Sequence, residues 1–395
     1  MNFIDKLRMI KAFCQTRWGG NFASRAALEA YQQRQLAQFC QQVAAKAPAF
    51  QPYLQQPFAS WPLMDKTCMM QQFAQRNTLG IELDAAWQVA QAAEQSRDFS
   101  PQLGDVTVGM SSGTSGNRGV FLVSRQERAR WAGIMLARAL PTHLLRQLLT
   151  PWAAKLKIAF FLRANSNLYT SLQSSRLDFG FYDLLDGAAA ALPRLNQSQP
   201  DVLVGPPALL KALAKAQQQG VLQIQPSHVL SVADVLEEAD KQLLAATFGV
   251  AVHQLYQATE GFLGYSCEHG NLHLNERYLY IERRYVDGAQ RRFQPIVTDF
   301  SRSTQLIVRY ALNDVLRQAP AACPCGRVEL HIEAIEGRSD DVLYLPALQP
   351  TSPEAALVAI YPDEIRRLLL LQAPEVDEYQ CVQHGMTWRL ALQAQ

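Results

Sequence analysis

The stretch "MSSGTSGNRGVFLVS", residues 110–124, contains three glycines, four serines and one threonine between two apolar segments. The segments on either side, "DVTVGM" (105–110) and "VFLVS" (120–124), are typical of strands. Glycines let an anion approach the backbone closely, and N–H groups and hydroxyls can then surround it. The pattern predicts a phosphate-binding loop between two strands, and the alternative is a hairpin with a wide polar turn.

Two familiar phosphate loops do not fit this stretch. The Walker pattern requires a lysine after its last glycine, whereas Val120 follows Gly119 here. The dinucleotide fingerprint requires a helix after its glycines, whereas a second strand is expected here. Residues elsewhere in the chain are therefore needed to decide what the loop binds.

Downstream of the loop, short apolar runs alternate with helical patterns. Ser124 and Glu127 have the spacing of a capping box, which predicts a helix directly after the second strand. This alternation predicts an α/β fold with a mainly parallel sheet covered on both faces by helices. The apolar runs expected to be its strands lie at residues 157–162, 201–205, 228–234 and 250–256.

The two ends of the chain have other patterns. Residues 1–100 are expected to form helices and loops, because alanine, glutamine and leucine dominate segments such as 25–47. After residue 260 the chain is expected to be rich in strands, and from 341 to form a small α+β unit. The strands expected after 260 lie at 271–274, 277–282, 294–300, 304–310 and 327–337.

The composition limits the classes of partner. The chain has 395 residues, 48% of them hydrophobic, and a formal net charge of +2, so neither nucleic acid nor an anionic membrane is implied. No signal peptide or membrane span is expected, because no apolar run has the required length. An odd number of cysteines, seven, favours reduced thiols in a cytoplasmic protein over a disulfide framework.

Three further motifs follow the loop in order: "YQATE" (256–260), "VRYALND" (308–314) and "EGRSDDVLYL" (336–345). Together with residues 111–119 they resemble the adenylate-forming superfamily, which includes acyl-CoA synthetases, peptide-synthetase adenylation domains and luciferase. The segments "WPLMDK" (61–66) and "CPCGR" (323–327) are similar to the branch of phenylacetate–CoA ligases and deazaflavin-coenzyme (CoF) synthetases. The resemblance covers about residues 57–345, and the tail more weakly.

The resemblance implies a large AMP-binding domain at 1–337 and a short C-terminal lid domain at 338–395. It implies ATP and Mg²⁺ as cofactors, with Thr259 at the α-phosphate, Glu260 at Mg²⁺ and Arg118 as a mobile cation in place of the family's lysine. The nucleotide-binding residues that it implies are Ser112, Gly113, Thr114, Ser115 and Gly116 at the phosphates, Asp234 and Tyr256 at adenine, Asp314 at ribose and Arg338 at the hinge.

The implied reaction joins a carboxylic acid to ATP, releases pyrophosphate and then transfers the acyl group to CoA, a carrier protein or another acceptor. The substrate is expected to be a small carboxylic acid, with an aromatic acid as the finer expectation. Residues 161–185, aromatic and largely uncharged, are a candidate wall of the acid pocket, and the alternative is that they belong to the core. A homodimer is compatible with the sequence. Two alternatives are kept: a nucleotidyltransferase acting on a cofactor, and a nucleotide- or acyl-binding protein with weak or no activity.

The second alternative comes from the end of the chain. The family's lid carries a late lysine that bridges the carboxylate and the α-phosphate, whereas the last lysine here is Lys241. After it only an arginine could take that role, such as Arg366, Arg367 or Arg389 in the tail. Either this subfamily adenylates without the lysine, or the chain is truncated, or activity is weak or lost.

A separate group of residues suggests a structural metal site. Cys267 with His269 or His273, and Cys323 with Cys325, offer three thiolates and an imidazole, a set suited to tetrahedral Zn²⁺. Similar sets occur in the branch of the family that the chain resembles. The alternative is three reduced cysteines beside a surface histidine.

Overall fold

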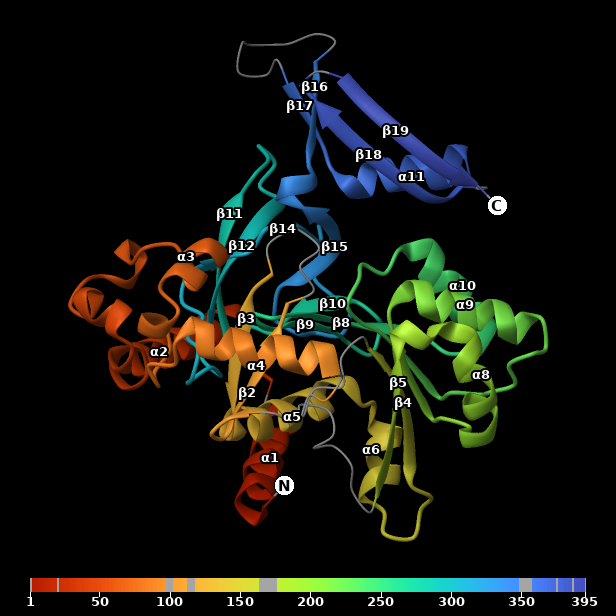
Figure 1. Ribbon diagram of the computed structural model, residues 1–395, viewed down its shortest axis with the longest axis horizontal. Helices are drawn as coiled ribbons and strands as arrows, with labels where there is room; N and C mark the ends of the chain where they lie inside the picture. Colours follow the sequence, from red (N-terminus) through yellow and green to blue (C-terminus); the bar gives the residue numbers. More distant parts are fainter. Residues whose placement is uncertain are drawn as a thin grey trace. The chain divides into compact units, whose positions relative to one another are not determined.

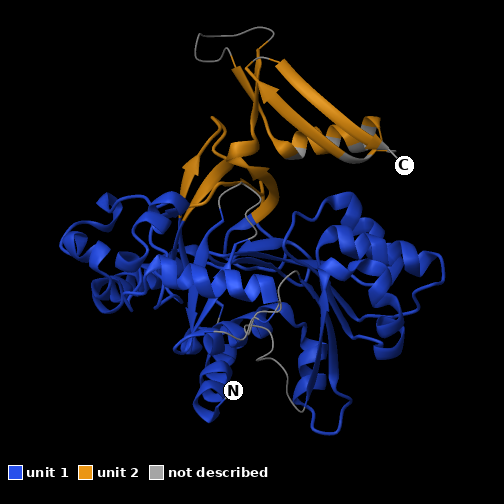
Figure 2. Ribbon diagram, in the orientation of Figure 1, with its two compact units in different colours: residues 1–281, 297–310, 322–331 blue, residues 282–296, 311–321, 332–395 orange. Residues whose placement is uncertain are grey.

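The computed structural model describes residues 2–19, 21–96, 98, 102–111, 118–162, 176–347, 357–373, 376–385 and 387–394. The chain divides into two compact units, which are described separately (Figure 2). Unit 1 comprises residues 1–281, 297–310 and 322–331, and unit 2 comprises residues 282–296, 311–321 and 332–395. The predicted domain boundary at 337/338 falls inside unit 2 and stays a prediction.

Unit 1 contains the predicted parallel sheet. Five strands pair in parallel in the order β5-β4-β6-β7-β8. Strands β9 and β10 continue the sheet in antiparallel pairing beyond β8. The strands are β4 (Leu156–Leu162), β5 (Leu177–Asp183), β6 (Val202–Gly205), β7 (His228–Ser231), β8 (Val252–Ala258), β9 (Gly261–Ser266) and β10 (Leu272–Leu274).

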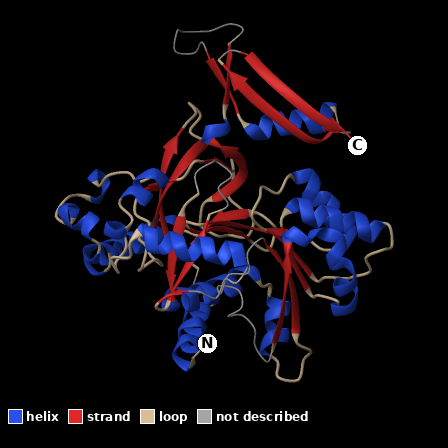
Figure 3. Ribbon diagram, viewed as in Figure 1, coloured by secondary structure: helices blue, strands red, loops and turns tan. Residues whose placement is uncertain are grey.

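Helices cover both faces of this sheet, as predicted (Figures 1 and 3). In β6, Val202 and Val204 pack with one layer of helices and Leu203 with the other, because successive side chains of a strand alternate between faces. Burial on both faces explains why these strands appear in the sequence as continuous apolar runs. One layer consists of α8 (Gly187–Ser198), α9 (Pro207–Gln218) and α10 (Glu238–Phe248), and the other of α1 (Phe3–Arg17), α5 (Arg125–Ala139) and α6 (Thr142–Leu149).

The predicted capping box begins α5. The Ser124 hydroxyl accepts from the Glu127 backbone N–H, and the Glu127 carboxylate accepts from the Ser124 N–H. Two N–H groups at the start of the helix are therefore satisfied. The described part of the chain contains no helix long and apolar enough to cross a membrane.

The first hundred residues are mainly helical, as expected. They form α2 and α3, a set of short 3-10 helices, and α4, which packs on a three-stranded antiparallel sheet, β1-β2-β3. The hairpin β2–β3 carries the glycine-rich stretch between its strands. The bounds are α2 (Arg25–Gln42), α3 (Lys66–Gln71), α4 (Leu83–Ser96), β1 (Gln102–Leu103), β2 (Val106–Met110) and β3 (Val120–Ser124).

Unit 2 has the predicted mixture of strands and helix. Its antiparallel strands β12, β14 and β15 pair in that order, and two further hairpins, β16–β17 and β18–β19, accompany α11. Strands β11, β12 and β15 begin or end in unit 1. The bounds are β11 (Leu279–Tyr285), β12 (Arg292–Asp299), β14 (Asp314–Gln318), β15 (His331–Arg338), β16 (Leu343–Pro346), β17 (Leu357–Ile360), α11 (Pro362–Gln372), β18 (Val376–His384) and β19 (Thr387–Ala394).

The predicted strand at 304–310 is wrong for most of its length. Only its last residue belongs to a strand, β13 (Tyr310–Ala311). The backbone N–H groups here bond outside a regular ladder: that of Leu306 reaches the Arg76 carbonyl, and that of Arg309 reaches Thr298 Oγ1. Arg309 also has a φ of +46°, which no extended strand accommodates.

Candidate active site

The ends of the glycine-rich loop are held together by a pair of hydrogen bonds. The Ser111 N–H donates to the Gly119 carbonyl over 2.8 Å, and the Gly119 N–H donates to Ser111 Oγ over 2.8 Å. The ends of strands β2 and β3 are thereby held together at the base of the loop that the sequence predicts to bind phosphate. Residues 112–117, which include the predicted Ser112, Gly113, Thr114, Ser115 and Gly116, lie outside the described residues.

A lysine that the sequence analysis did not select lies at this point. Asp65 caps α3 by accepting from the Cys68 N–H over 2.7 Å, which fixes Lys66 in the first turn. Lys66 Nζ donates to Ser111 Oγ over 3.1 Å. A Cβ at position 119 would lie 2.8 Å from Lys66 Cε, so the glycine leaves the space that the lysine crosses. The motif "WPLMDK" contained this residue but served only as a mark of resemblance.

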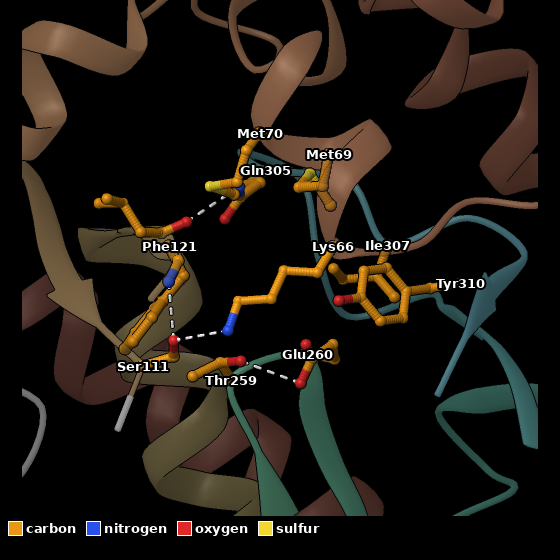
Figure 4. A pocket seen from close by; sticks show the side chains of 12 residues that line it. Lys66, Met69, Met70, Ser111, Phe121, Thr259, Glu260, Gln305, Ile307 and Tyr310 are labelled. Atoms are coloured by element: carbon orange, nitrogen blue, oxygen red, sulfur yellow. Dashed lines mark hydrogen bonds between the residues drawn. The ribbon is translucent and has the colours of Figure 1, made fainter. Parts of the chain in front are cut away.

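Two predicted residues, Thr259 and Glu260, lie with Lys66 around one cavity (Figure 4). They form the turn between β8 and β9, where Thr259 Oγ1 donates to Glu260 Oε2 over 2.9 Å. The cavity has an empty volume of about 310 Å³, part of it open to solvent. Its lining residues are Lys66, Met69, Met70, Ser111, Gly119, Val120, Phe121, Thr259, Glu260, Gln305, Ile307 and Tyr310.

Tyr310 controls the polarity beside Glu260. Burial, together with the charge of Glu260 and a hydrogen bond to it, raises the pKa of Tyr310. The phenol therefore stays protonated at neutral pH and donates to the carboxylate. Glu260 is thus held from two sides, by Thr259 and Tyr310.

A buried arginine joins the two segments that carry these residues. Arg302 Nη2 donates to the Thr259 carbonyl over 2.5 Å, and its Nη1 donates to the Leu122 carbonyl over 3.2 Å. Leu122 lies in β3, two residues after the cavity residue Val120. Arg302 therefore ties the strand that leaves the loop to the turn that carries Thr259 and Glu260.

Glu127 holds the segment from which Arg302 projects. Beyond its role in the capping box, its Oε1 accepts from the backbone N–H groups of Ser303 (2.5 Å) and Thr304 (2.9 Å). Burial opposes ionisation of Glu127, but the charge of Arg302 and the backbone donors hold its pKa below the usual range. The carboxylate is therefore charged and fully engaged. The sequence predicted Glu127 only as part of the capping box, and it gave Arg302 no role.

Among the residues that the structure describes, the other predicted nucleotide residues of unit 1 do not line the cavity. Arg118 is exposed, with Nη1 3.7 Å from Met110 Sδ. Tyr256 is buried in β8, and Asp234 is exposed after the end of β7. In unit 2, Asp314 and Arg338 are direct neighbours across β14 and β15.

The candidate wall at 161–185 is only partly described. Phe161 and Tyr182 are buried and stack with ring centroids 4.6 Å apart. Both belong to the core beneath α8, α9 and α10. Residues 163–175 lie outside the described part, so their role in an acid pocket remains an expectation.

Beside Asp234, Ala233 has a φ of +73°, a left-handed conformation that disfavours a side chain. Ala233→Gly is therefore expected to raise the free energy of unfolding by about 0.5–1 kcal/mol, the relieved strain less the added flexibility of the unfolded chain. The matched control is Ala92→Gly on the exposed side of α4, which should lower it by about 1 kcal/mol. Urea unfolding measures both, and a destabilised A233G protein would contradict the expectation.

The predicted metal ligands also come together within unit 1. One ligand atom from each of Cys267, His273, Cys323 and Cys325 lies within 4.8 Å of the others, and His269 is not in the group. The sulfurs of Cys267 and Cys323 are 3.7 Å apart, and Cys325 Sγ lies 3.4 Å from His273 Nε2. Zinc–sulfur bonds of about 2.3 Å in a tetrahedron place two sulfurs about 3.8 Å apart.

The other ring nitrogen of His273 also supports a metal site. His273 Nδ1 is 3.0 Å from the Glu329 carbonyl. A carbonyl only accepts, so Nδ1 carries the proton and Nε2 presents its lone pair to the three sulfurs. Histidines that bind metals commonly have this arrangement.

Comparison with known proteins supports the fold. No family model matches the chain, and no curated protein matches its sequence. Among solved structures, 2-hydroxyisobutyryl-CoA ligase in the postadenylation state with 2-HIB-AMP matches with a TM-score of 0.64 and 18% identity, over 94% of this chain and 79% of that one. Its open conformation with 2-HIB-AMP and CoA gives a TM-score of 0.60 and 16% identity, over 94% and 81%. The chain therefore shares its α/β fold with 2-hydroxyisobutyryl-CoA ligase.

Proposed function

We propose that the protein is an adenylate-forming ligase, which joins a carboxylic acid to ATP, releases pyrophosphate and passes the acyl group to CoA. The observation that carries the proposal is that Lys66, the closed base of the glycine-rich loop and the pair Thr259–Glu260 line one cavity. The fold supports it, because the solved structures that share it are of a CoA ligase bound to an acyl-AMP.

The chemistry makes modest demands on the protein. A carboxylic acid is ionised at neutral pH, so it attacks the α-phosphorus without a general base. A bond forms from the carboxylate oxygen to phosphorus, and the bond from phosphorus to the oxygen of the departing pyrophosphate breaks. Charge builds up on pyrophosphate, and a fixed cation lowers the barrier by neutralising it.

Lys66 is suited to supply this cation. Its ammonium group is positioned by α3 and Ser111 at the base of the loop. Thr259 is suited to donate a hydrogen bond to a phosphate oxygen when it turns from Glu260.

Glu260 fits the role proposed for it at Mg²⁺. It is the carboxylate among the described residues that line the cavity, and Mg²⁺ is commonly held by one or two carboxylates and substrate phosphates. When bound, the ion would draw electron density from the phosphates of ATP. The hydrogen bonds from Thr259 and Tyr310 would keep Glu260 oriented towards the cavity.

Exchange of labelled pyrophosphate into ATP tests the proposal. Purified protein, Mg²⁺ and pools of aryl and alkyl carboxylic acids should give exchange that depends on the acid, and dividing the active pool identifies it. Loss of free thiol on adding CoA then tests the second step. If folded protein binds ATP but no pool supports exchange, the proposal fails in favour of a nucleotide-binding protein. Label from ATP that stays on an acceptor as AMP would favour the nucleotidyltransferase.

The finer assignments remain proposals with the same support. We place the protein nearest the phenylacetate–CoA ligase and CoF synthetase branch, with a small aromatic carboxylic acid as substrate. Asp314, Tyr256 and Asp234 are proposed to bind ribose and adenine, and the glycine-rich loop to bind the phosphates. A cytoplasmic location and a homodimer are further expectations.

A structural zinc ion is proposed at Cys267, His273, Cys323 and Cys325. Purified protein is expected to contain about one zinc ion per chain. Cys323→Ser should remove it and lower the melting temperature, because zinc binding free energy contributes directly to folding. Cys381→Ser, which removes a half-buried thiol in unit 2, is the matched control. The zinc content of the wild-type protein and the two variants tests the site. Wild-type protein that contains no zinc, and whose melting temperature equals that of C323S, would reject it.

A further inference from the structure

Helix α1 has an exposed apolar face that is opposite the one that packs on the protein. Phe3, Leu7 and Ile10 have the i, i+4, i+7 spacing of one helix face. Ile4 borders this face, and Trp18 continues it at the C-terminal end of the helix. The exposed fractions are 74% for Phe3, 56% for Ile4, 49% for Leu7, 52% for Ile10 and 59% for Trp18. These five residues are called the outer face of α1.

The exposure of this face does not come from a loosely attached helix. The inner side of α1 packs along α5 so closely that a Cβ at Gly133 would lie 2.2 Å from the Met9 carbonyl (Figure 1). Thr16 Oγ1 lies 2.5 Å from the Tyr278 hydroxyl, and Arg17 donates to the carbonyls of Ala137 and Leu140. The helix is fixed at its middle and at its C-terminal end, so its outer face is presented in one orientation.

Positive charges border the outer face. Lys6, Arg8 and Lys11 are exposed, and the one carboxylate of the helix, Asp5, is buried between Arg8 and Arg125. The neighbouring α5 adds Arg125 and Arg128, opposed by Asp105. A net charge of +2 for the whole chain therefore conceals a local surface where cations outnumber acids.

This charge distribution argues against a second copy of the chain as the covering partner. Two outer faces packed together would bring Lys6, Arg8 and Lys11 near their own counterparts, with no exposed acid on the helix to pair with them. Like charges in such positions are repulsive. The partner should therefore be anionic as well as apolar.

We propose that the outer face of α1 binds to an anionic lipid surface and holds the enzyme at a membrane without crossing it. A bilayer interface offers an apolar layer for Phe3, Leu7, Ile10 and Trp18, and phosphates at the level that lysine and arginine side chains reach. On α1 the apolar side chains likewise lie at the centre of the outer face, and the cationic side chains lie at its borders. A convex single helix suits this flat surface, whereas an acidic protein would need a matching groove.

Vesicle sedimentation tests the proposal with the full chain. Phosphatidylcholine vesicles that contain phosphatidylglycerol should bind the protein in low salt. Pure phosphatidylcholine vesicles should bind it with an affinity at least roughly 10-fold lower, because each basic residue near an anionic surface adds to the attraction. Phe3→Ser/Leu7→Ser/Ile10→Ser should abolish binding, and Lys6→Gln/Lys11→Gln should weaken it about 10-fold or more. Leu185→Ser/Val221→Ser removes two exposed apolar side chains elsewhere and should leave binding unchanged.

Three results would overturn the proposal. The first is that folded protein does not bind anionic vesicles. That result would be expected if an acidic protein covered this face instead. The second is binding that the triple serine variant retains. The third is that light scattering shows a dimer for the wild-type protein and a monomer for the triple serine variant, because a second copy would then cover the face. Melting curves of every variant show that the fold is intact, since the replaced side chains are exposed.

Discussion

Lys66→Ala is expected to slow acid-dependent pyrophosphate–ATP exchange by about 10²–10³-fold, the usual cost of removing one electrostatic donor from a transition state. The ammonium group lies at the base of the glycine-rich loop, 3.1 Å from Ser111 Oγ, and shares its cavity with Thr259 and Glu260. The loss should fall on kcat more than on KM, because the charge that Lys66 meets grows as pyrophosphate departs.

Two further variants separate the charge of Lys66 from its place. Lys66→Arg keeps the charge with a bulkier group and should give intermediate activity. Gly119→Ala keeps the lysine but places a Cβ 2.8 Å from Lys66 Cε, so the lysine must move and activity should fall towards that of K66A. Both outcomes would show that the position of the cation matters as much as its presence.

Lys46→Ala is the matched control, since Lys46 is an exposed lysine in a 3-10 helix and is not among the residues that line the cavity. Its exchange activity should equal that of wild type. Melting curves should also coincide, because Lys66 is only half-buried. A K66A protein within about twofold of wild-type kcat would remove Lys66 from the transition state. Wild-type protein without exchange would instead count against the proposed reaction, so the two failures are distinguishable.

The parallel sheet could be predicted because its signal is local. Strands buried on both faces require apolar residues at every position, and residues 157–162 and 201–205 meet this requirement. The capping box of Ser124 and Glu127 was equally local, as was the turn with Thr259 and Glu260 at the end of a strand. Ordered motifs then allowed the fold to be recognised.

The remainder of the site depends on contacts between distant segments. Lys66 and Ser111 are 45 residues apart, and Arg302 reaches carbonyls 180 and 43 residues away. A single cation, in a helix as short as α3 or in an irregular segment, leaves no periodic pattern that would reveal such a contact. The failed strand at 304–310 has the same cause: its apolar run of Leu306, Ile307 and Val308 is typical of a strand, but the N–H groups of Leu306 and Arg309 bond to Arg76 and Thr298.

Glu127 makes both a local contact that the sequence predicts and distant contacts that it does not. Its removal should have a large effect on stability. One carboxylate oxygen closes the capping box, and the other accepts from Ser303 and Thr304, 176 and 177 residues away. Glu127→Ala would leave these backbone donors unpaired and would remove one of the carboxylates near buried Arg302, leaving Asp299. The expected loss in the free energy of unfolding is about 3–5 kcal/mol, as when one partner is removed from a buried charge pair.

Glu127→Gln and Glu127→Asp distinguish charge from shape. The glutamine retains one accepting oxygen and the length of the side chain, so it should recover part of the loss. The aspartate keeps the charge but is too short to reach both Ser124 and Ser303. If stability follows charge alone, with E127D near wild type and E127Q near E127A, the bridging role is wrong.

The pH dependence gives the sign of the electrostatic part. Because Arg302 and the backbone donors hold the pKa of Glu127 below its unfolded value of 4.5, its stabilisation is complete above that pH and is lost as pH falls through the lower folded value. Wild-type protein should therefore lose stability in this acidic range more steeply than E127Q. Equal slopes in urea unfolding between pH 3 and 6 would contradict a charged Glu127. Since Arg302 also holds the Thr259 carbonyl, E127Q should lower exchange activity at neutral pH, where the protein is still folded.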